Sequence, residues 1–158
     1  MVRVVTLGPE DWERLRQIRL RSLSQDPDAF GSTLQREAGF DRQTWESRLR
    51  TGQWFLALCG QEPCGVVAGI TLDAPDERHL VSLWVAPEQR GEAIGAQLAQ
   101  PVIDWARRDG ARRLLLWVME DNLKAIRLYE RLAFRPTGRS QALPRDHRRR
   151  ETEMALDL

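Results

Sequence analysis

The sequence predicts an α+β fold, a three-layer sandwich whose helices cover both faces of a mixed, mainly antiparallel sheet. Three observations predict it: two helical patterns near the N-terminus, a strand–helix–strand crossover in the middle, and two strand-like runs at the end. The crossover, which supplies the one parallel pair, consists of strand 78–86, helix 94–109 and strand 112–119. Because no linker or repeat interrupts the pattern, residues 1–158 are expected to form a single domain.

The N-terminal third supplies an edge strand and two helices. Residues 2–7 are mostly β-branched, which indicates a strand, and Pro9 then opens a helix with acidic residues in its first turn. Pro27 ends this helix, and Asp41 caps the next one.

A hairpin follows, formed by the apolar runs 54–59 and 65–72. Cys59 and Cys64 flank its turn. Two cysteines are too few for a disulfide framework, so we interpret them as structural thiols, with a disulfide across the hairpin as the alternative. His79 and His147 lack ligand spacing with the cysteines, so no metal site is predicted.

The crossover helix has a clear buried face and one unfavourable residue. Gly110 provides its C-terminal stop, whereas Pro101 lies inside it and is expected to loosen it locally. The apolar face consists of Leu98, Val102, Ile103 and Ala106. After the next strand, residues 122–132 form a short helix, and residues 134–139 and 152–158 are expected to pair as a hairpin.

Composition excludes several classes of protein. The chain is 42% hydrophobic and 30% charged with a net charge of +1, which indicates a globular protein with no overall attraction to nucleic acid or membranes. No apolar run is long enough to span a membrane, and the N-terminus lacks a signal-peptide pattern. We therefore expect a cytoplasmic protein. The basic loop 145–150 is expected to be solvated, with contact to an acidic partner as the alternative.

The turn between the crossover strand and its helix carries the chemical signal. Residues 86–96 read APEQRGEAIGA. The free N–H groups and dipole of a helix N-terminus favour an anion such as a phosphate. The turn lacks both the dinucleotide fingerprint and the P-loop motif, so it is a different type of phosphate site.

Two motifs resemble the GNAT superfamily of acyl-CoA-dependent N-acetyltransferases. The frame Arg90-Gly91-Glu92-Ala93-Ile94-Gly95 is similar to the family's [Q/R]-x-x-G-x-[G/A] pyrophosphate turn. The segment from Asn122 to Phe134 is similar to its N-x-x-A-x-x-x-Y-x-x-x-G-F segment. The segment DPDAFGSTL further resembles small bacterial members.

The resemblance implies acetyl-CoA as cofactor and a set of residues that hold it. The pantetheine arm would run beside a bulged strand near Val85, where a backbone N–H would stabilise the oxyanion. Asn122 would hydrogen-bond the pantetheine arm. The implied cofactor-binding residues are Leu83, Trp84, Val85, Arg90, Gly91, Glu92, Ala93, Ile94, Gly95, Ala96, Asn122, Ala125 and Tyr129.

The resemblance also assigns two catalytic residues. Tyr129 would protonate the leaving thiolate, and His79, six residues before Val85, would deprotonate the amine. For Tyr129 the alternative is a packing role, and for His79 a solvated strand end. A water chain ending at Glu120 or Asp76 could replace His79 as the base.

Three residues depart from the family pattern. Glu92 places a carboxylate near the phosphate site, and Ala93 and Ala133 replace glycines. Because alanine is the best helix former, we expect Ala93 to adopt helical geometry.

The implied function is transfer of an acetyl group from acetyl-CoA to a primary amine by direct attack in a ternary complex. The acceptor would be a small-molecule or protein amine, and a homodimer is left open. The alternative is a catalytically weak GNAT-like module that binds CoA or a partner, which Glu92 and Ala93 favour.

Overall fold

The computed structural model describes residues 1–91 and 93–158 and contains one seven-stranded sheet, ordered β1-β2-β3-β4-β5-β7-β6. The strands are β1 (Val2–Leu7), β2 (Gly52–Cys59), β3 (Glu62–Ile70), β4 (Glu77–Val85), β5 (Arg113–Met119), β6 (Arg135–Leu143) and β7 (Asp146–Asp157). The α-helices are α1 (Trp12–Gln25), α2 (Leu34–Ala38), α3 (Arg42–Thr51), α4 (Ile94–Arg108) and α5 (Leu123–Arg131). Short 3₁₀ turns are η1 (Pro9–Asp11), η2 (Pro27–Ala29) and η3 (Pro87–Gln89).

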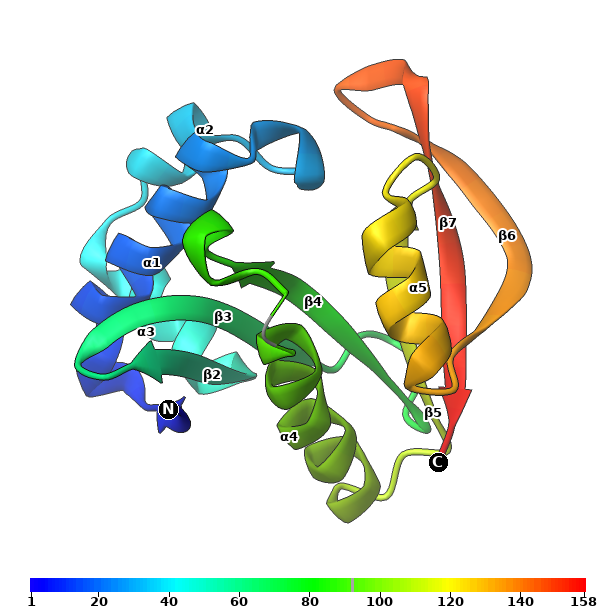
Figure 1. The fold of residues 1–158 in the computed structure, drawn as a ribbon, viewed down its shortest axis with the longest axis horizontal. Helices are drawn as coiled ribbons and strands as arrows, with labels where there is room; N and C mark the ends of the chain where they lie inside the picture. The colour runs from blue at the N-terminus through cyan, green and yellow to red at the C-terminus, as the bar shows by residue number, and fades with distance from the viewer. Residues whose placement is uncertain (92) are drawn as a thin grey trace.

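The three-layer α+β arrangement predicted from the sequence is confirmed. Helices α4 and α5 lie on one face of the sheet, and α1, α2 and α3 lie on the other, over its N-terminal half (Figure 1). β4 and β5 form the parallel pair, and the other neighbouring strands are antiparallel. The final hairpin does not simply extend the sheet, because β7 inserts between β5 and β6.

The parallel pair is short, and this shapes the middle of the sheet. β4 and β5 pair only where Glu77–His79 lies against Arg113–Leu115. Both strands continue well beyond these residues without pairing, so they diverge toward the N-terminus of α4. The backbone groups that face this gap have no ladder partner, which leaves them free to bind an extended ligand.

A β-bulge in β4 lies beside the gap. Val66 pairs with Trp84 and Ala68 with Val81, so two residues of β4 oppose one residue of β3. Ser82 has a φ of 62°, which is rare for a residue with a side chain. The bulge that the family resemblance implied near Val85 therefore lies at Ser82 and Leu83.

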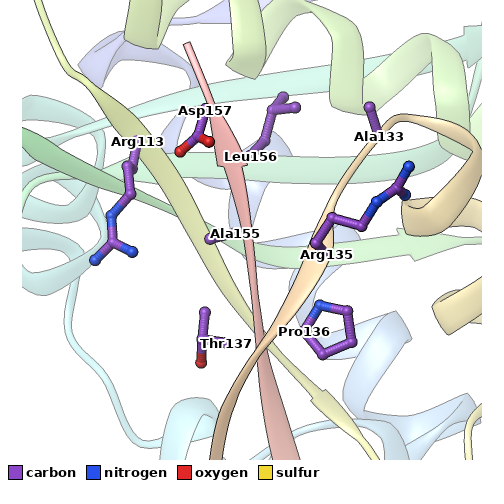
Figure 2. Close-up of a pocket in the computed structure, with 8 residues that line it drawn as sticks. All are labelled: Arg113, Ala133, Arg135, Pro136, Thr137, Ala155, Leu156 and Asp157. Atoms are coloured by element: carbon purple, nitrogen blue, oxygen red, sulfur yellow. The ribbon is translucent and has the colours of Figure 1, made fainter.

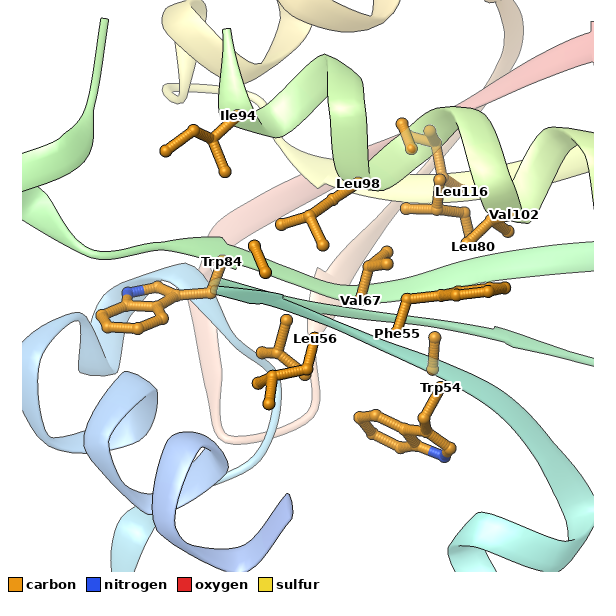
Figure 3. Packing of buried hydrophobic residues seen from close by; sticks show 14 of the residues in the cluster. Trp54, Phe55, Leu56, Val67, Leu80, Trp84, Ile94, Leu98, Val102 and Leu116 are labelled. Carbon is orange, nitrogen blue, oxygen red and sulfur yellow. The ribbon is translucent and has the colours of Figure 1, made fainter. Parts of the chain in front are cut away.

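The core has one layer under α1 and α3 and another between α4 and the sheet. Leu98 and Val102 of α4 pack toward Val67, Leu80 and Leu116 of the strands (Figure 3). The predicted apolar face is confirmed, because Leu98, Val102, Ile103 and Ala106 are all at most 3% exposed. The helix runs uninterrupted from Ile94 to Arg108 through Pro101.

The prediction that Cys59 and Cys64 are free thiols is wrong. The structure joins them in a disulfide across the β2–β3 turn. Their Cα atoms lie 6.0 Å apart, within the range that a disulfide spans, because the hairpin places its two ends side by side.

A buried ion cluster fixes the three N-terminal helices. Glu37 of α2 is 1% exposed and accepts from Arg19 of α1 at 2.9 Å and Arg48 of α3 at 2.8 Å. Burial raises the pKa of Glu37, but the hydrogen bond and charge of Arg19, with help from Arg48, outweigh it and lower the pKa to about 2. The carboxylate therefore stays charged and holds the three helices together.

No helix in residues 1–91 and 93–158 is long and apolar enough to cross a bilayer.

Candidate active site

The turn before α4 presents its backbone toward solvent. Gly91 has a φ of +90°, and a Cβ atom there would meet no other atom within 4 Å. Among the described residues, the bond from Gln97 N to Ala93 O, 3.2 Å, is the first of the helix, and the N–H groups of Ile94, Gly95 and Ala96 have no helical acceptor within that part of the chain. These three donors point out of the helix end, where its dipole favours an anion.

The expectation for Ala93 is wrong. Ala93 has a φ of 62° and a ψ of 20°, because it is the N-cap residue at which the chain turns into α4. A left-handed alanine costs about 1 kcal/mol relative to glycine. Glu92, the other departure in this turn, lies outside the described residues.

Close packing brings α5 to the start of α4. A Cβ atom on Gly95 would lie 2.9 Å from Cδ2 of Leu128, so glycine permits this approach. The side chain of Ile94 is 2% exposed and belongs to the core, so its contribution to a ligand is limited to its backbone. This contact holds α5, the helix that carries Tyr129, beside the turn.

The tyrosine itself is buried. It is 6% exposed, and its ring packs edge-to-face on Phe134 with centroids 5.7 Å apart. Burial raises the pKa of Tyr129, so its hydroxyl stays protonated at neutral pH, as a proton donor requires. Ala133, between these two rings in sequence, has a φ of 76°, so both alanines that replace family glycines adopt a glycine-like conformation.

Asn122 has a structural role that the sequence analysis missed. Its Oδ1 accepts from the N–H of Ala125 at 3.2 Å and so caps α5. The capping bond uses the side-chain oxygen and leaves the amide Nδ2 as a donor.

His79 lies at the point where the strands begin to diverge. It is the last β4 residue paired with β5, opposite Leu115, and it is half-buried. Burial lowers the pKa of His79, and the charges of Glu77 and Glu153 only partly offset this. The imidazole is therefore neutral near pH 7, the state in which it can accept a proton.

The turn before α4 is connected by hydrogen bonds to Asp26, which lies between α1 and η2. The sequence analysis did not single out this residue. Asp26 Oδ2 accepts from Arg90 Nη2 at 2.7 Å and from Trp84 Nε1 at 2.7 Å. Arg90 Nε also donates to the carbonyl oxygen of Val85 at 3.0 Å. The indole of Trp84 is thus turned away from the gap, so only the backbone of Trp84 is available to a ligand there.

The basic loop 145–150 is only partly solvated. Arg145 Nη2 donates to the carbonyl oxygens of Pro27 at 2.8 Å and Phe30 at 2.6 Å. Arg149 lies 3.5 Å from Asp28, whereas Arg148 is 95% exposed. The β6–β7 hairpin therefore docks on the η2 segment, and two of its arginines are structural.

A hollow of about 450 Å³ lies elsewhere, at the C-terminal end of β7 (Figure 2). None of the predicted site residues lines it. It is bordered by Arg113, Ala133, Arg135, Pro136, Thr137, Ala155, Leu156 and Asp157. Within residues 1–91 and 93–158, no three His, Cys, Asp or Glu side chains gather as metal ligands would.

Diverging parallel strands beside an open helix N-terminus form a fold suited to an extended ligand with phosphate groups. The chain belongs to the acetyltransferase (GNAT) family, whose pattern it matches over residues 12–134. Among solved structures, it is similar to a GNAT acetyltransferase from Streptococcus pneumoniae, with a TM-score of 0.85, 20% identity and coverage of 100% of this chain and 99% of that one. A putative acetyltransferase from Salmonella typhimurium, solved with its cofactor acetyl-CoA, gives a TM-score of 0.81 at 18% identity, over 100% and 94% of the two chains.

Curated relatives share shorter segments. An uncharacterized N-acetyltransferase from Bacillus subtilis is 40% identical over 57 residues, which cover 36% of this chain and 23% of the relative. The chain spans at most about half the length of the first curated relatives, at 23%, 49% and 42%.

Proposed function

We propose that this chain transfers the acetyl group of acetyl-CoA to a primary amine by direct attack in a ternary complex. The observation that carries the proposal is the divergence of β4 and β5 below the N-terminus of α4, where Leu128 of α5, the helix that bears the protonated Tyr129, packs against Gly95. The acetyl-CoA-bound neighbour from Salmonella typhimurium and the relatives named N-acetyltransferases support the same cosubstrate and reaction.

The turn residues would hold the phosphates of the cosubstrate. Gly91 provides an open backbone, and the N–H groups of Ile94, Gly95 and Ala96 would donate to the pyrophosphate. The pantetheine arm would lie between the diverging strands, against the backbone of residues 83–85, with the Asn122 amide donating from the start of α5.

The reaction needs one base, one oxyanion donor and one acid. The neutral imidazole of His79 would take a proton from the acceptor ammonium, and the free amine would form a C–N bond to the thioester carbonyl carbon. A backbone N–H near the Ser82 bulge would stabilise the oxyanion, which collapses as the C–S bond breaks. The Tyr129 hydroxyl would donate a proton to the departing thiolate, and the second proton lost by the attacking nitrogen, as it becomes the amide, would restore the hydroxyl of Tyr129.

Two measurements test this function. Acetyl-CoA should raise the melting temperature, because it binds the native state, and a panel of primary amines should elicit thiol release that depends on both substrates. Stabilisation without thiol release for any amine would favour the binding-module alternative. Absence of both would exclude the proposed function.

A further inference from the structure

Several charged and aromatic side chains share the sheet face opposite α4. Leu80 and Leu116 pack against Val102 of α4 (Figure 3), so the neighbouring residues of their strands point to the other face. His79 pairs with Leu115 of β5, and Trp117 follows Leu115 by two residues, so both lie on this face. Glu153 of β7 pairs with Trp117 and therefore projects beside it.

Glu153 is a buried carboxylate, 3% exposed. Thr137 Oγ1 donates to one of its oxygens at 2.8 Å, and Arg139 Nη1 lies 3.3 Å from the other. Opposite Glu153, the register of β6 shifts between Pro136 and Ser140, so three residues of β6 face one of β7. The bulge thus places a hydroxyl and a cation against a carboxylate that burial would otherwise destabilise.

The cation at this position is loosely held. The guanidinium of Arg139 lies 5.6 Å from the ring centroid of Trp117, close enough for a cation–π contact. Its side chain is nevertheless 71% exposed, and ion pairs of exposed side chains contribute little stability. The ring of Trp117, the buried carboxylate of Glu153 and the hydroxyl of Thr137 thus surround a position for a cation. The exposed side chain of Arg139 occupies this position.

We propose that Glu153 and Trp117 bind a second cationic group of the acceptor, which displaces Arg139, so that the preferred substrates are amines with two cationic groups. This inference rests on the proposed acetyl transfer. β5 separates β7 from β4, and Glu153 lies opposite Trp117, two residues beyond the partner of His79, which places the Cα atoms of Glu153 and His79 roughly 12 Å apart. A linear acceptor could therefore present one amine near His79 while its other cation contacts Glu153 and Trp117.

The test compares cadaverine with pentylamine, which has the same chain but one amine. In the wild type, kcat/KM measured by thiol release should be higher for cadaverine by about tenfold or more, the scale of one charge-assisted contact. Glu153→Gln should bring the ratio close to one. Glu151→Gln is the matched control, because Glu151 lies two residues away on the same face of β7 and bonds Gln141 instead; it should keep the wild-type ratio.

Arg139→Ala should have the opposite effect. Removal of the competing guanidinium should lower the KM for cadaverine several-fold, roughly the strength of an exposed ion pair, although the protein becomes less stable. If Glu153→Gln fails to fold, Trp117→Leu should lower the same ratio. A wild-type ratio near one, or equal losses for both amines in Glu153→Gln, would overturn the proposal.

Calorimetry separates this inference from the proposed function. Cadaverine titrated into the protein without acetyl-CoA should bind to the wild type and not to Glu153→Gln. Binding without any thiol release would retain the cation site and reject acetyl transfer. Thiol release with no diamine preference would retain acetyl transfer and reject the cation site.

Discussion

Two regions, the turn before α4 and the sheet face opposite α4, position their polar groups by different means. We call the second region, which carries His79, Trp117, Arg139 and Glu153, the open face. The turn uses residues that are close together in the chain, and the backbone N–H groups of Ile94, Gly95 and Ala96 point out of it because a helix begins there. The open face uses side chains from four strands, His79 of β4, Trp117 of β5, Arg139 of β6 and Glu153 of β7. A site made of residues close in sequence can be predicted from a sequence motif. A site made of side chains from several strands forms only when those strands pair in the folded sheet.

The two regions also treat charge differently. At the turn, the Arg90 side chain is paired with Asp26, so the proposed anion site consists of uncharged backbone donors. On the open face, Glu153 is buried and needs Thr137 and Arg139 as partners. Substitutions at the turn should therefore alter cofactor affinity, and substitutions on the face should alter acceptor use.

Gly91→Asp should have the largest effect on acetyl-CoA binding and should act on that step alone. It forces a side chain into a φ of +90° and adds negative charge beside the proposed phosphates, so acetyl-CoA affinity measured by calorimetry should fall by roughly 100-fold or more. Gly110→Asp is the control, because Gly110 has a φ of +81° at the other end of the same helix. Equal losses in both variants would mean that strain, rather than the phosphate site, explains the result.

Tyr129→Phe should separate chemistry from binding. It keeps the packing on Phe134 and removes only the hydroxyl, so kcat should fall by roughly 10–10³-fold, as for loss of a general acid, with little change in acetyl-CoA affinity. Steady-state kinetics with the best amine of the panel provide the measurement. An unchanged kcat, where chemistry limits the rate, would make Tyr129 a packing residue.

His79→Ala tests the acceptor side through its pH dependence. Because burial lowers the pKa of His79, wild-type kcat/KM should rise with pH through an apparent pKa below about 6.5 and level off as the imidazole becomes neutral. The variant should lose this limb and about 100-fold in rate, partly regained at high pH where free amine is abundant. A wild-type profile in the variant would assign proton removal to another group.

Asp26→Asn tests whether the contact between Asp26 and Arg90 affects cofactor binding at the turn. It removes the partner of Arg90 and a negative charge near the proposed phosphates, so acetyl-CoA should bind a few-fold more tightly, within the range of an exposed ion pair. Glu88→Gln is the control, because Glu88 pairs with Arg21 rather than with Arg90. Weaker acetyl-CoA binding in Asp26→Asn would show that the carboxylate orients Arg90 productively.

Ala93→Gly and Ala133→Gly should give the smallest effects and should act on stability. Each alanine has a positive φ, so glycine should stabilise the fold by up to about 1 kcal/mol, or roughly 2–4 °C in melting temperature. Ala99→Gly, a buried position inside α4, should instead destabilise the protein. A loss of stability in Ala93→Gly and Ala133→Gly would show that unfolded-state entropy outweighs the relief of strain.

The sequence by itself determined the layers, the crossover and the position of the phosphate-type turn. These follow from short-range patterns: the period of Leu98, Val102 and Ala106 along one helix, and the turn residues that precede it. The segment from Asn122 to Phe134 could also be recognised from the sequence, because its residues are close together in the chain. The conformation of Ala93 was misjudged because helix propensity describes the interior of a helix, whereas this residue is the N-cap.

Tertiary structure alone decided the rest. The short pairing of β4 with β5, the insertion of β7 beside β5 and the contact of Asp26 with Arg90 all join residues far apart in the chain. In the sequence Glu153 alternates with Glu151 as an exposed strand residue would, and its burial became visible only with Trp117 beside it. Such arrangements depend on which elements become neighbours, and that choice is made by packing of the whole core rather than by any local pattern.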